Sequence, residues 1–131
     1  MKKWFNYKGT ISGKTYLFRS LILGIPLSIV YSLLEDVNYY AGFIFGLFVY
    51  IILYSFRYKR ISAVFKNKID LGKKLFYISV SLELFSEVYY LFNIELWQSE
   101  YFALIDLIVV PSFILMLFIL FKDSGIEKHD G

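Results

Sequence analysis

The 131-residue sequence contains no cysteine and a single histidine, His129. Without cysteine the chain forms no disulfide and offers no thiolate metal ligand, no haem attachment point and no thiol nucleophile. His129 lies in a polar segment at the end of the sequence, so a histidine metal site or a catalytic triad would need residues from another chain. We therefore expect no metal site and no cofactor.

Phosphate-cradling glycine loops, nucleophile elbows and zinc-binding motifs are also missing. No motif of an RNA- or DNA-binding module accompanies the net charge of +3, and net charge alone indicates only non-specific attraction. The sequence therefore predicts that the protein is not an enzyme and has no nucleic-acid partner.

Apolar residues, by contrast, are abundant: 58% of the residues are hydrophobic, 21% are aromatic, and the mean hydropathy is +0.58. A soluble domain of this size cannot hide so much apolar surface in one core, whereas a bilayer removes the need to hide it. Four apolar stretches each approach the roughly 20 residues that a helix needs to cross hydrocarbon. We predict an all-α integral membrane fold, a single domain over 1–131, with four transmembrane helices at about 16–34, 37–56, 75–94 and 101–121.

The basic residues are distributed unevenly along the chain. All fourteen Lys and Arg residues lie before or at the start of the first apolar stretch, between the second and third, or after the fourth. In the short connections Glu35–Asp36 and Glu95–Glu100, the only charged residues are acidic. The short connections predict two antiparallel hairpins, and the positive-inside rule predicts that both termini lie in the cytoplasm. It makes 57–74 a basic cytoplasmic loop and 122–131 a polar tail, which we expect to fray.

The predicted basic loop suits contact with anionic lipid headgroups. Ile61, Val64 and Phe65 recur at helical spacing among basic residues, which is typical of a short helix lying in the headgroup layer. The simpler interpretation is that the charges only set the orientation of the chain. The candidate headgroup contacts are Arg57, Lys59, Arg60, Lys66, Lys68, Lys73 and Lys74.

One predicted span carries a polar stripe. Its members share about a third of the helix circumference, and they are Ser79, Glu83, Ser86, Glu87, Tyr90 and Asn93. Asp106 enters the fourth span at roughly the depth of Glu87. Because a carboxylate at membrane depth costs about 2.5–3.5 kcal/mol on insertion scales, we expect these side chains to face the bundle interior or a wet cavity.

The stripe permits three interpretations. The acids hold helices together through hydrogen bonds, with Ser or Tyr partners or with Arg19; or a partner subunit completes the stripe; or the acids pass ions or protons. In the second span, Gly42 and Gly46 form a G-x-x-x-G spacing that lets two helix backbones approach closely. That spacing fits packing within the chain as well as homodimerisation.

Three segments resemble the small bacterial inner-membrane family known as domain of unknown function 805. The segment before the first span is similar to an aromatic and basic pattern of the family, and Thr10 and Gly13 stand where the family has arginines; the matching residues are Tyr7, Gly9, Ile11, Lys14 and Tyr16. The end of the sequence is similar to the family's apolar helix with a glycine-containing tail through Leu120, Phe121, Lys122, Gly125 and Gly131.

The remaining segment lies between these two in the sequence. Its Lys59 and Arg60 resemble the family's basic pair, and Ser62 and Ala63 occupy the place of a His-Asp element. The resemblance implies a multi-pass protein of the bacterial inner membrane and implies no particular activity.

These observations predict a non-catalytic inner-membrane protein that acts as an accessory or structural subunit through helix–helix contacts. Its expected partners are the lipid bilayer with its anionic headgroups, and another membrane protein or a second copy of itself. A minor ion or proton conduit using buried carboxylates, and an immunity protein against a pore-forming toxin, are the alternatives.

Overall fold

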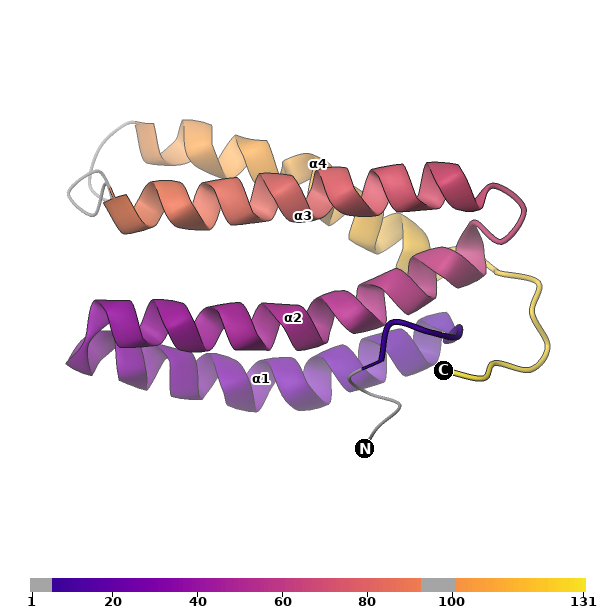
Figure 1. Ribbon diagram of the computed structural model, residues 1–131, viewed down its shortest axis with the longest axis horizontal. Helices are drawn as coiled ribbons and strands as arrows, with labels where there is room; N and C mark the ends of the chain where they lie inside the picture. Colours follow the sequence, from indigo (N-terminus) through magenta and orange to yellow (C-terminus); the bar gives the residue numbers. More distant parts are fainter. Residues whose placement is uncertain (1–5, 93–100) are drawn as a thin grey trace.

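A computed structural model describes residues 6–92 and 101–131 of the chain (Figure 1). The described residues form four α-helices: α1 (Gly13–Val37), α2 (Tyr39–Val64), α3 (Ile69–Phe92) and α4 (Tyr101–Phe121). Each helix contains an apolar stretch long enough to cross a membrane. The prediction of an all-helical chain with four helices capable of spanning a bilayer is thus confirmed.

Side chains at the helix ends explain where the first two helices start and stop. Ser12 caps α1, because its hydroxyl accepts a hydrogen bond from the Thr15 N–H at 3.1 Å. Asn38 separates α1 from α2 and serves both: its own N–H donates to the Leu34 carbonyl at 2.8 Å, and its side-chain oxygen accepts from the Tyr40 N–H at 3.0 Å. A single residue therefore ends one helix and begins the next.

The prediction of a long basic loop over 57–74 is wrong. Helix α2 continues to Val64 and α3 begins at Ile69, so that residues 65–68 alone connect them. The separate headgroup helix around Ile61 is likewise absent, because that residue belongs to the last turns of α2 and is fully buried. Polar residues that follow an apolar stretch can continue its helix when other segments of the chain cover them.

The helices pack as neighbours along the chain. Helix α1 packs mainly against α2, α3 packs mainly against α4, and α2 also packs along α3 (Figure 1). Large apolar side chains point away from the bundle all along its length; Phe18, Phe48 and Phe113 are each about 60% exposed. Apolar surface of this extent is typical of helices solvated by lipid.

The small buried core lies at one end of the bundle. It joins the segment before α1 and the start of α1 to parts of α2, α3 and α4 through Ile11, Tyr16, Ile61, Phe76 and Ile119. Away from this end, the ribbons of α2 and α3 lie farther apart (Figure 1). The polar cavity described below lies between them.

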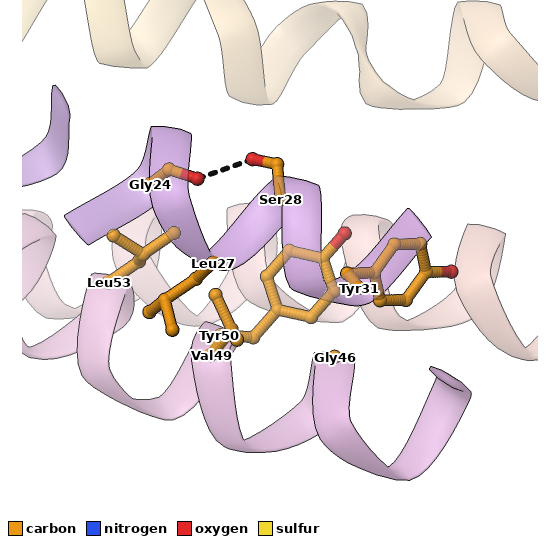
Figure 2. A pocket seen from close by; sticks show the side chains of 8 residues that line it. All are labelled: Gly24, Leu27, Ser28, Tyr31, Gly46, Val49, Tyr50 and Leu53. Carbon is orange, nitrogen blue, oxygen red and sulfur yellow. Dashed lines mark hydrogen bonds between the residues drawn. The ribbon is translucent and has the colours of Figure 1, made fainter. Parts of the chain in front are cut away.

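The G-x-x-x-G glycines bring α1 and α2 together within the chain. A Cβ atom at Gly42 would lie 3.0 Å from the Glu35 Cα and N atoms, and one at Gly46 would lie 2.8 Å from the Tyr31 ring. Figure 2 shows Gly46 of α2 facing Tyr31 of α1. The small residues therefore allow close backbone approach inside this chain, which is one of the two roles that the spacing permits.

The Gly42→Ala variant should unfold more easily than the parent, by about 1–3 kcal/mol, because the new methyl group meets backbone atoms of α1 that move only with the whole helix. Unfolding in mixed micelles with increasing SDS measures the difference. Gly24→Ala is the matched control, since nothing lies within 4 Å of a Cβ there. It should be neutral or stabilise the helix by up to about 1 kcal/mol. Equal losses in the two variants would contradict this packing role.

The polar tail is docked and does not fray. It runs from the end of α4 back to the segment that precedes α1 (Figure 1). The Gly131 N–H donates to the Thr10 carbonyl at 2.9 Å, and the Thr10 N–H donates to Asp130 Oδ1 at 2.9 Å. Arg19 Nη2 donates to the Gly131 main-chain oxygen at 3.1 Å. Hydrogen bonds between segments about 120 residues apart in the chain order a tail that composition alone marks as loose.

Docking of the tail should weaken as the pH falls below 6.5. Burial lowers the pKa of His129 from 6.5, the charge of Arg60 lowers it further, and Asp130 acts in the opposite direction. The folded state thus favours the neutral ring, so its contribution is complete above pH 6.5 and is lost as the pH falls through the lower pKa of the docked state. Hydrogen exchange of 122–131 measures this loss. The His129→Gln variant, which does not titrate, should show no such change.

Candidate functional site: a polar cavity between α2, α3 and α4

A cavity of about 430 Å³ lies between α2, α3 and α4. Four residues of the predicted stripe line it, and they are Glu83, Ser86, Glu87 and Tyr90. Asp106, which the depth argument placed near Glu87, lines it as well. Helix α2 contributes Tyr50, Leu53, Tyr54 and Arg57, and α4 contributes Val109, Phe113 and Met116. Polar groups from three helices therefore meet at one place in the bundle.

A largely buried ion pair is part of the cavity lining. Arg57 Nη1 lies 2.7 Å from Glu83 Oε1, and the two side chains are 8% and 16% exposed. Ser112 on α4 donates its hydroxyl hydrogen to the same Glu83 oxygen, and Arg57 Nη2 lies 3.0 Å from Met116 Sδ. The guanidinium thus connects α2 to α3 and to α4. A low-dielectric surrounding strengthens such a pair, provided that both partners are present.

Two tyrosines hold the other carboxylates of the cavity. The Tyr50 hydroxyl of α2 donates to Glu87 Oε1 of α3 at 2.8 Å. The Tyr90 hydroxyl of α3 donates to Asp106 Oδ1 of α4 at 2.7 Å. Each carboxylate therefore has a donor on a neighbouring helix, and the two bonds link α2, α3 and α4 in sequence.

The remaining stripe residues lie apart from the cavity. Ser79 is buried but donates its hydroxyl hydrogen to the Phe76 carbonyl of its own helix at 2.8 Å. Asn93 lies outside the described residues. Arg19, which we considered as a partner for the acids, contacts Gly131 instead. The cation that the sequence interpretation missed is Arg57.

The prediction of headgroup contact is wrong for three of its seven residues. Arg57, Lys59 and Arg60 are 6%, 0% and 3% exposed and are enclosed by protein. Their burial follows from the extension of α2 into the core at the end of the bundle. The other four predicted contacts are exposed, and they are Lys66, Lys68, Lys73 and Lys74.

Arg60 joins three segments that are distant in sequence. Its Nε donates to the Ile119 carbonyl at 2.6 Å, its Nη1 donates to the Ile11 carbonyl at 3.2 Å, and its Nη2 donates to the Lys122 carbonyl. Ile119 and Lys122 mark the end of α4, where carbonyl groups lack partners within the helix and attract a cation. Arg60 thereby caps α4 and holds the segment before α1 against it.

Comparison with known proteins finds no relative. No protein-family model matches the chain. Neither a curated protein nor a solved structure matches it. Within 6–92 and 101–131, no three His, Asp or Glu side chains are grouped so that they could hold a metal ion. The charged and hydroxyl groups that line the cavity are three carboxylates, the hydroxyls of Ser86 and three tyrosines, and one guanidinium.

Proposed function

We propose that the chain is a multi-pass protein of the bacterial inner membrane, built as two antiparallel transmembrane hairpins with both termini in the cytoplasm. Support for this orientation comes from charge: every lysine among the described residues belongs to the end of the bundle that carries the docked tail. Glu35 and Asp36 belong to the opposite end, where α1 meets α2. The positive-inside rule assigns the lysine-bearing end to the cytoplasm.

Within that membrane, the proposed role is a non-catalytic accessory or structural subunit that acts through helix–helix contacts. The observation that carries it is the use of the polar groups at membrane depth. The Arg57–Glu83 pair and the bonds of Tyr50 and Tyr90 all join one helix to another. Polar bonds of this kind fix the arrangement of helices in lipid. The outward faces then offer apolar surface to the helices of a partner or a second copy.

A photocrosslinking amino acid placed on the outer surface tests this role. Position 48 is suitable because Phe48 is among the most exposed large side chains of α2. We expect a crosslinked complex of discrete mass in native membranes, and a matching complex after extraction in mild detergent. Position 56, where the native phenylalanine is fully buried, is the matched control and should yield internal crosslinks only. A lone monomer in both preparations would refute the contact role.

Passage of protons or small cations is a second candidate, favoured by the charge of the cavity. Its lining holds three carboxylates, Glu83, Glu87 and Asp106, but only one cation, Arg57. Because Arg57 pairs with Glu83, two carboxylates face the cavity without a cationic partner in the lining. Flux into liposomes should then fall in Glu87→Gln. Unchanged flux in that variant, or none in the parent, would exclude passage.

A further inference from the structure

We propose that the cavity between α2, α3 and α4 binds a protonated organic amine with an apolar substituent, held by the carboxylates of Glu87 and Asp106 and by aromatic rings. The inference uses the site of the second candidate function, but binding does not require passage across the membrane. The ligand class follows from the charge, the walls and the size of the cavity.

The charges of the residues that line the cavity favour a cationic ligand. Glu87 and Asp106 lie on adjacent helices and both line the cavity, and each accepts a hydrogen bond from a neutral tyrosine hydroxyl. The only cation of the lining, Arg57, contacts Glu83. A carboxylate has several acceptor positions, so one tyrosine bond leaves others open to a donor in the cavity. A ligand with positively charged N–H groups matches this excess of acceptors.

Aromatic rings give the cavity a second means of holding a cation. Tyr50, Tyr54, Tyr90 and Phe113 line it. The Arg57 guanidinium carbon already lies 5.1 Å from the centre of the Tyr54 ring, which is within the distance of a cation–π interaction. A ring environment that accommodates one cation of the protein suits the ammonium group of a ligand.

One wall of the cavity carries a hydroxyl group that lacks a partner. Tyr54 is 5% exposed, and its hydroxyl oxygen has no hydrogen-bond partner among the described residues. Buried hydroxyl groups in folded proteins are almost always hydrogen-bonded. An ammonium group in the cavity would supply the missing donor to the Tyr54 oxygen. This hydroxyl adds a third polar group to the lining, besides the carboxylates of Glu87 and Asp106.

The size of the cavity favours an organic amine over a metal ion as the ligand. A volume of about 430 Å³ lies in the range of sites for small organic molecules and far exceeds one dehydrated ion. Among the described residues no three acidic or histidine side chains are grouped for a metal. Val109, Phe113 and Met116 form an apolar wall on α4, where a hydrocarbon substituent of the ligand would pack.

Equilibrium dialysis of the full chain in detergent micelles tests the proposal, with radiolabelled phenethylamine as the probe. The parent should bind it saturably, at one molecule per chain. Propylbenzene, which has nearly the same shape but no charge, should not compete. The double variant Glu87→Gln with Asp106→Asn should bind at least about tenfold more weakly, since a cation loses two opposite charges in a poorly screened site.

Two controls keep the result decisive. Glu127→Gln removes an acid from the exposed tail and should bind like the parent. Tyr54→Phe removes only the unpartnered hydroxyl, so it should fold normally and still bind several-fold more weakly. The proposal would be overturned if the parent showed no saturable binding, if both cavity variants bound phenethylamine as tightly as the parent, or if propylbenzene competed effectively. Binding without flux would retain this inference and exclude only passage; flux without amine binding would do the reverse.

Discussion

Replacing Arg57 with methionine should lower the free energy of unfolding by about 3–5 kcal/mol, the loss typical of breaking a buried ion pair. The variant leaves the Glu83 carboxylate, 16% exposed, without its cation between α2 and α3. It also removes the guanidinium contact with Met116 on α4. Unfolding in mixed micelles with increasing SDS, followed by circular dichroism, measures the loss.

A double-mutant cycle separates the pair from the rest of the cavity. The Arg57→Met, Glu83→Gln double variant should recover a substantial part of the stability, because no unpaired charge then stays in the bundle. Lys73→Met removes one positive charge from an exposed position of α3 and should change stability by no more than about 0.5 kcal/mol. Additive losses of the two single variants would contradict the ion pair as the source of the effect.

Replacing Arg60 with methionine should release the tail and the segment before α1 together. Three main-chain carbonyls, at Ile11, Ile119 and Lys122, would lose their common donor. Each buried carbonyl left without a donor costs about 1–3 kcal/mol, so we expect a loss of at least about 2 kcal/mol. Limited proteolysis within 122–131 should accelerate in proportion, since cleavage follows the population of the open form.

The matched control is Lys66→Met. Lys66 also bonds to the tail, through the Gly125 carbonyl at 3.1 Å, but at an exposed position. Its loss should change the cleavage rate little, because water replaces an exposed hydrogen bond. If both variants accelerated cleavage equally, general charge attraction would account for the docking of the tail, and the three carbonyl bonds of Arg60 would not.

The polar stripe shows how much of the candidate site a local sequence pattern can predict. Glu83, Glu87 and Tyr90 recur at the helical period, which predicted that they share a face of α3, and the structure has them along one cavity. Counting residues from the connection between the third and fourth spans likewise placed Asp106 at about the depth of Glu87. Both arguments need only the rise and period of a helix. Neither argument identifies a partner on α2, because that choice depends on how α2 and α3 are aligned.

Tyr50 and Arg57 were missed for that reason. With α2 assumed to end at 56, Arg57 fell into a loop and its charge was assigned to lipid. With the bounds of α2 and α3 at Val64 and Ile69, Tyr50 lies roughly level with Glu87. A count of residues across the turn at 65–68 brings Tyr50 to within about one helical turn of Glu87 but leaves Arg57 about two turns from Glu83, so the count would have found Tyr50 and not Arg57.

By itself, the sequence determined that the chain forms four helices able to cross a bilayer, and that Glu83 and Glu87 share one face of the third. Hydropathy and helical period depend on residues that are close together in the sequence, so they can be determined without knowing how the helices pack. Only the tertiary structure decided that Arg57, Lys59 and Arg60 are buried and that the tail is docked. Those outcomes depend on partners such as Glu83, Ile119 and Thr10, which are distant in sequence and adjacent only after the helices have packed.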